Sequence, residues 1–235
     1  MLSSDTPVLM AGEARVFPLP PDRTCASVAR SALSIVMHEM GLPADLIDDG
    51  TLAVSELSTN ALVHANGEAA ELWVWVRTTP HPALVVSVFD ADPRELVTPV
   101  CRDLLAESGK GLAIVAALAE DMGTHCSRSR LRPCPVSGKA VWFSLALPDA
   151  WLEPCETVTP LQAGCGLLIE LCLRGLFAAH INEFDTSVLV TVEELCVEIT
   201  STHYTWCGAD GELVHVPLPN TQEAIEAIIA HVDSP

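Results

Sequence analysis

Two apolar segments that stand close together, Leu72–Arg77 and Leu84–Phe89, constrain the fold of this chain most strongly. Both are rich in valine and other residues that favour strands, and the short sequence TTPHP separates them. Strands joined by so short a polar connection predict a β-hairpin. An alternation of apolar and polar residues predicts a further strand over Ala140–Leu147.

Helical patterns surround these strands. Residues 13–20 predict a short edge strand closed by prolines, and the first helix follows it and stops at Gly41. A second helix is expected from about residue 43 to residue 64, and a third over Gly111–Met122. The first helix shows apolar residues at helical spacing: Ala26, Ala29, Leu33, Val36 and Met40.

The pattern changes in the last third of the chain. Residues 161–180 predict an apolar helix, 187–206 and 212–218 a hairpin around CGADG, and 220–232 a short helix. We therefore divide the chain into a flexible start (1–12), a first domain (13–150), a linker (151–160) and a C-terminal α+β domain (161–235). The apolar helix predicts either a surface for a homodimer or partner, or a buried core helix.

Composition narrows the classes of function. Of 235 residues, 49% are hydrophobic and 18% charged, so a sizeable core is expected. The net charge of −19 disfavours nucleic acid and anionic lipid as partners, because both attract basic proteins. The N-terminus lacks a secretory signal pattern, and the most apolar segment, Gly166–His180, is too short to cross a bilayer. A cytoplasmic location is the expectation.

The nine cysteines form no CxxC pair and have no regular spacing. They are more simply interpreted as reduced, mostly buried side chains than as metal ligands or disulfide partners.

A polar stripe on the second helix carries side chains that could bind a metal or take part in a reaction. Glu56, Asn60 and His64 recur at intervals of four residues within SELSTNALVHA, so they share one face of the helix. An asparagine oxygen suits a hard cation such as magnesium, and a nearby carboxylate can orient or deprotonate a nucleophile. An exposed polar face without chemistry is the alternative.

Two more features follow along the chain. Asp90 ends the apolar strand before a long loop, residues 91–108, and its carboxylate could accept a hydrogen bond from an exocyclic amine such as that of adenine. The sequence GKGLAIV then opens a helix. Its glycines, Gly109 and Gly111, allow the backbone to approach a phosphate, and the helix N-terminus and Lys110 favour an anion.

The order of these elements resembles that of the GHKL ATPase family. It runs from the ExxxN helix through the hairpin ending in Asp, the loop and the GxGL helix to the closing strand GKAVWFSLAL. Within this family the chain looks most like the RsbW-like anti-sigma-factor serine kinases. The resemblance covers roughly residues 13–148. It implies a two-layer α/β sandwich of the GHKL (Bergerat) type, to which the C-terminal α+β unit would be an addition.

The resemblance also implies roles and ligands. Glu56 would be the catalytic base, Asn60 would coordinate Mg²⁺ on ATP, and Asp90 would bind the adenine amino group. The loop 91–108 would be the ATP lid. The phosphates would lie against Gly109, Lys110, Gly111 and Leu112. The expected partners are a sigma factor and an anti-sigma antagonist protein.

The sequence also departs from the family. Asp92 and Pro93 stand where the first glycine box often has glycines. Ala140 replaces a usual threonine, which would remove a hydroxyl near adenine. Two interpretations follow: a kinase that phosphorylates a serine of an antagonist protein, or a non-catalytic module that uses ATP to select protein partners. Retention of Glu56 favours the kinase, and the altered glycine box favours the module.

Related families fit less well. A sensor histidine kinase needs an acceptor histidine on a dimerising hairpin, and His38 lies too close to the ExxxN helix for that. The chaperone, gyrase and mismatch-repair relatives supply a lysine from a second domain, but the C-terminal unit of this chain contains no lysine.

Overall fold

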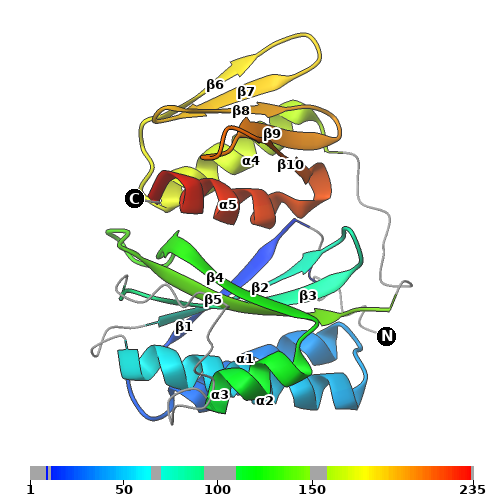
Figure 1. Ribbon diagram of the computed structural model, residues 1–235, viewed down its shortest axis with the longest axis vertical. Helices are drawn as coiled ribbons and strands as arrows, with labels where there is room; N and C mark the ends of the chain where they lie inside the picture. Colours follow the sequence, from blue (N-terminus) through cyan, green and yellow to red (C-terminus); the bar gives the residue numbers. More distant parts are fainter. Residues whose placement is uncertain (1–8, 10–11, 65–69, 93–109, 149–157, 234–235) are drawn as a thin grey trace, which may run out of the picture.

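The computed structural model describes residues 9, 12–64, 70–92, 110–148 and 158–233. They form two five-stranded antiparallel sheets and five α-helices, so the predicted α+β class is confirmed. Figure 1 shows alternating layers of helices and strands. The elements of the first part are β1 (Ala14–Leu19), α1 (Cys25–Glu39), α2 (Ala44–His64), β2 (Ala70–Arg77), β3 (Ala83–Asp90), α3 (Lys110–Leu118), β4 (Asp121–Arg128) and β5 (Ser137–Ala146).

The first sheet has the strand order β1-β2-β3-β5-β4, and α1, α2 and α3 cover one of its faces (Figure 1). The predicted hairpin is confirmed, because β2 and β3 pair antiparallel with Leu72 opposite Val88. Side chains alternate across each strand, so every second residue faces the helices. Leu72, Val86 and Phe143 are among those that pack into this core. The predicted two-layer sandwich is thereby confirmed.

The third helix is shorter than predicted. We expected a helix over 111–122, but α3 ends at Leu118 and the chain turns into β4. The sequence of β4, DMGTHCSR, shows no apolar alternation, because most of this edge strand is only half-buried. Backbone pairing with β5 holds it in the sheet.

The second sheet has the order β10-β9-β8-β7-β6. Helices α4 and α5 lie between the two sheets (Figure 1). Most of the linker predicted over 151–160 lies outside the residues that the structure describes. The elements of this part are α4 (Pro160–Leu173), β6 (Ala179–Glu183), β7 (Val188–Val192), β8 (Leu195–Ile199), β9 (His203–Cys207), β10 (Leu213–Pro217) and α5 (Thr221–Asp233).

The helix predicted over 161–180 ends early, at Leu173, because Gly175 adopts a left-handed conformation with φ of 82°. The amide of Gly175 donates to the carbonyl of Cys172, and the amide of Leu176 donates to that of Leu171. This is a Schellman ending, which satisfies the last carbonyls of the helix.

Both sequence interpretations of the apolar helix have some basis in α4. Its residues Leu167 and Leu171 are fully buried in the second core. Ile169 and Leu173 instead remain exposed, at 59% and 47%. A homodimer through this helix therefore stays a prediction.

The region predicted as one hairpin contains more strands. The strands β9 and β10 pair antiparallel around GADG, as predicted. Residues 188–199 form a further hairpin of β7 and β8, whose turn places Glu193 at a φ of 52°. A glutamate is not a usual turn residue, which is why the pattern did not indicate this turn.

Polar contacts join the second face of the first sheet to α4 and α5. Arg174 Nη2 donates to Glu226 Oε1 at 2.8 Å, and Ser127 Oγ of β4 donates to Glu226 Oε2 at 2.7 Å. His125 Nε2 lies 3.1 Å from the same Oε2. The guanidinium of Arg174 is fully buried, 4.1 Å from the centre of the Trp73 ring. We call Glu226, Arg174, His125 and Ser127 the Glu226 cluster.

Among the described residues, none of the helices combines the length and the apolar character that a membrane crossing requires.

Candidate nucleotide site

The stripe predicted on α2 lies beside the beginning of α3. Glu56 and Asn60 are both half-buried on α2. On the other side of the helix Val54 and Ala61 are buried in the core, as their small apolar side chains predict. His64 is the last residue of α2.

Glu56 and the glycine-rich turn meet in space. A Cβ atom on Gly111 would lie only 2.6 Å from Glu56 Oε2, so only a glycine fits here while the carboxylate keeps this position. Lys110, the first residue of α3, is exposed, and Leu112 packs against the core. The first amides of a helix have no partner within the helix and can bind an anion. The Glu56 carboxylate and the turn predicted to bind phosphate are therefore neighbours.

Asp90 occupies the end of β3, where its side chain is buried. Its Oδ1 accepts a hydrogen bond from the amide of Asp92 at 3.0 Å. Lys139 of β5 is directly opposite Asp90, and its Nζ lies 3.8 Å from Oδ2. Both side chains point to the helix-covered face, since cross-strand partners share a face and Val88 and Val141 pack there.

Lys139 lies at the candidate site, and we did not predict it there. Two features of the sequence could have indicated Lys139: the chain has few basic residues, and this one stands at the start of an apolar strand. The neighbouring Ala140 corrects one expectation. Its side chain packs with Trp73 and Phe89 on the opposite face of the sheet, so a hydroxyl at this position would not face Asp90.

Several predicted parts lie outside the described residues: Gly109, Pro93 and all but the first two residues of the loop 91–108. His38, the rejected acceptor, is exposed on α1 and hydrogen-bonds the backbone carbonyl of Ser34 in its own helix.

The chemistry of these groups fits ATP with a magnesium ion. Asn60 and Glu56 supply neutral and anionic oxygen donors, which a hard cation prefers. The described residues contain no cluster of three or more histidine, cysteine or acidic side chains that could hold a metal by themselves. A magnesium ion bound by one or two side chains and by substrate phosphates needs no such cluster.

Residues 19–142, more than half of the chain, match the histidine kinase-like ATPase domain family. The chain belongs to this family. The matched region contains α1–α3, most of the first sheet, and Glu56, Asn60 and Asp90. Membership in this ATPase domain family indicates that the chain binds ATP.

Other comparisons add little. No curated protein matches the chain. One solved structure that matches is the SiaB–SiaC complex from Pseudomonas aeruginosa. The identity is 16%, the match covers 56% of this chain and 88% of that one, and the TM-score is 0.41.

Proposed function

We propose that this chain is an ATP-dependent regulatory protein kinase of the RsbW-like type. It transfers the γ-phosphoryl group of ATP to a serine of an antagonist protein and controls a sigma factor by binding it. The observation that carries this proposal is the position of the Glu56 carboxylate against Gly111, at the start of α3. A base beside the phosphate-binding turn is what phosphoryl transfer to a hydroxyl requires.

Each residue has one task in the proposed reaction. Glu56 accepts the proton of the serine hydroxyl as that oxygen bonds to the γ-phosphorus and the bond to the β-phosphate oxygen breaks. Lys110 and the amides of α3 hold the phosphates. Asp90 accepts a hydrogen bond from the adenine amino group. When bound, a magnesium ion held by Asn60 neutralises phosphate charge.

A non-catalytic module is the second candidate, and the altered glycine box favours it. Asp92 stands where the family often has a glycine, and its amide donates a hydrogen bond to Asp90 Oδ1 at 3.0 Å. In such a module ATP would stabilise one conformation and select a protein partner, and no phosphoryl group would be transferred.

A transfer experiment separates the two candidates. The protein is incubated with γ-labelled ATP, magnesium and an extract of the native cell, beside the Glu56→Gln variant. The kinase proposal expects a labelled phosphoserine protein with the wild type only. ATP binding without labelled protein supports the module, and equal labelling with both forms excludes Glu56 as the base.

Nucleotide binding is measured separately with a fluorescent ATP analogue. Asp90→Asn is expected to weaken binding about tenfold or more, because an amide also presents a donor to the adenine amine. Glu120→Gln, an exposed change on the same domain, is the matched control. Equal affinity of Asp90→Asn and wild type would refute the adenine assignment.

A further inference from the structure

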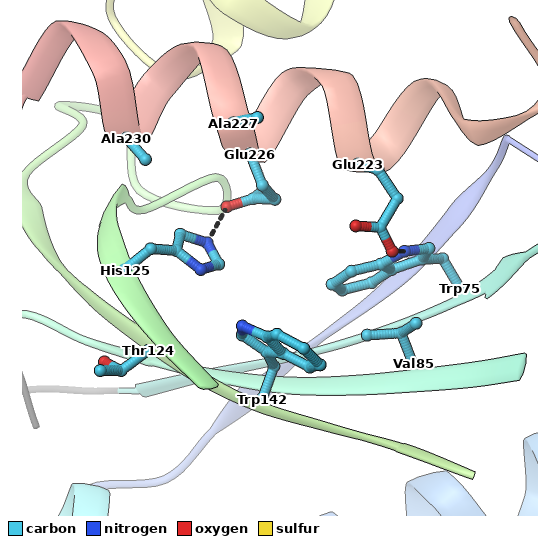
Figure 2. A pocket seen from close by; sticks show the side chains of 9 residues that line it. All are labelled: Trp75, Val85, Thr124, His125, Trp142, Glu223, Glu226, Ala227 and Ala230. Atoms are coloured by element: carbon cyan, nitrogen blue, oxygen red, sulfur yellow. Dashed lines mark hydrogen bonds and ion pairs between the residues drawn. The ribbon is translucent and has the colours of Figure 1, made fainter. Parts of the chain in front are cut away.

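A cavity of about 300 Å³ lies between α5 and the face of the first sheet opposite the nucleotide site. Figure 2 shows α5 on one side of it and the indoles of Trp75 and Trp142 on the other. This volume is at the lower end of the range for small-molecule sites. None of the residues assigned to nucleotide binding lines it.

The sequence of α5 creates this space. Glu223, Ala227 and Ala230 recur at helical spacing, and all three line the cavity. Opposite the two alanines lie the large indoles of Trp75 and Trp142. The Trp142 indole covers Gly123 of the neighbouring strand. Two alanines facing two tryptophans leave a volume that larger residues of α5 would fill.

Glu223 places a carboxylate in this apolar space. Its Oε1 accepts a hydrogen bond from Trp75 Nε1 at 3.1 Å. Within the described part of the chain its second oxygen has no hydrogen-bond partner, and Glu223 forms no salt bridge. Burial raises the pKa of Glu223, which indicates that its charge is incompletely compensated.

Glu226, the second carboxylate at the cavity, already has several partners. Glu226 accepts from Arg174, Gln222 and Ser127, and His125 lies against it. Arg77, a cation whose charge partly offsets the effect of burial on the pKa of Glu223, donates to Ser144 and lies 6.0 Å from the centre of the Trp142 ring. Its buried Nε has no hydrogen-bond partner among the described residues. Among the described residues, the free oxygen of Glu223 and the unpaired hydroxyl of Thr124, which also lines the cavity, are the acceptors that a ligand would meet.

We propose that this cavity binds a small organic cation, an ammonium group carried on an aryl or short alkyl body. The ammonium donates to the free oxygen of Glu223, and the body packs against the two indoles. Indole faces attract cations, and a charge-assisted hydrogen bond is stronger than a neutral one. An anion would face two carboxylates, and a purely apolar ligand would leave the Glu223 oxygen buried without a donor.

The test uses the full chain with phenethylammonium chloride as probe and 2-phenylethanol as its neutral counterpart. Binding is followed by calorimetry and by tryptophan fluorescence, to which Trp75 and Trp142 contribute. A dissociation constant between about 1 μM and 1 mM is expected for a ligand of this size. The alcohol is expected to bind about tenfold more weakly. Equal binding of the two, or no binding of the cation up to about 10 mM, overturns the proposal.

Variants locate the site. Glu223→Gln is expected to weaken the cation about tenfold, with an unchanged circular dichroism spectrum. Ala227→Leu fills the cavity and should abolish binding. Glu198→Gln, on an exposed residue of β8, is the matched control and should bind as the wild type does. Unchanged affinity in folded Glu223→Gln rejects the site. Binding of the ATP analogue is expected to be the same in all these variants, so the outcome is independent of the nucleotide site.

Discussion

At the scale of single residues, the position of Glu56 depends on a glycine on another helix. The start of α3 reaches the Glu56 carboxylate only because Gly111 has no side chain. The atom that an added Cβ would meet is the end of a flexible side chain, which can rotate away without disturbing the core. This separates the effect of a substitution on the reaction from its effect on stability.

We therefore expect Gly111→Ala to displace the Glu56 carboxylate while the protein stays folded. Phosphoryl transfer should fall by about 10²-fold or more, the usual contribution of a positioned base. The melting temperature should change by no more than a few degrees, since alanine favours the helix. Transfer of label from ATP and a thermal melt measure the two effects. Full activity of this variant would argue against Glu56 as the base.

Glu226 gives the stability a predictable dependence on pH. Burial favours its neutral form, but the charge of Arg174 and hydrogen bonds from His125 and Ser127 outweigh this and lower its pKa to about 2. Because the pKa is depressed on folding, the ionised carboxylate stabilises the fold above its ordinary pKa of 4.5. This contribution, about 3 kcal/mol, is lost as the pH falls from 4.5 towards 2.

The measurement compares urea unfolding of the wild type and Glu226→Gln at several pH values. The difference in unfolding free energy should be largest at neutral pH and shrink below pH 4.5. Taking the difference separates Glu226 from Glu223, whose raised pKa acts in the opposite direction. A difference that is constant with pH would contradict the assignment.

At the scale of elements, α4 shows how one residue ends a helix that the pattern would have continued. The residues after Leu173 remain apolar, so periodicity alone extended the helix to 180. Gly175 ends it by adopting a positive φ. It also lies close to Pro135, where a Cβ would be 3.2 Å from that side chain.

Gly175→Ala is expected to lower the unfolding free energy by about 1–2 kcal/mol, because alanine is strained in the left-handed region. The matched control is Gly166→Ala within the same helix, where an added Cβ meets nothing within 4 Å. That change should raise stability by up to about 1 kcal/mol. Denaturant unfolding of both variants tests the opposite signs. Loss of stability in both would indicate that Gly166 has a role of its own.

At the scale of the whole molecule, the C-terminal unit covers the second face of the ATPase sheet. The sequence placed an α+β unit after a linker and indicated nothing of where it sits. In the structure it contributes Arg174 and Glu226 to a buried polar contact with β4, and Asn220 accepts from the Thr78 amide at 2.9 Å. Buried charges are costly unless they are paired, so we expect this interface to favour one arrangement of the two sheets.

Arg174→Met is expected to destabilise the fold by about 3–5 kcal/mol, because it leaves Glu226 buried without its ion-pair partner. The double variant Arg174→Met with Glu226→Gln should recover part of the loss, since no charge then remains unpaired. Urea unfolding of the two single variants and the double variant measures this coupling. Strictly additive losses would show that the ion pair does not couple the residues.

The sequence by itself determined the hairpin, the class of fold and the order of Glu56, Asn60, Asp90 and the GKGL turn, because these depend on local periodicity and spacing. Only the tertiary structure decided that Lys139 faces Asp90, that Ala140 faces away, and that Gly111 meets Glu56. Strand β4 was not predicted because pairing with β5, rather than an apolar pattern of its own, holds it in the sheet. The contact between the two units could not be predicted from the sequence either. Arg174, Glu226 and Ser127 are far apart along the chain and meet only when the two layers pack.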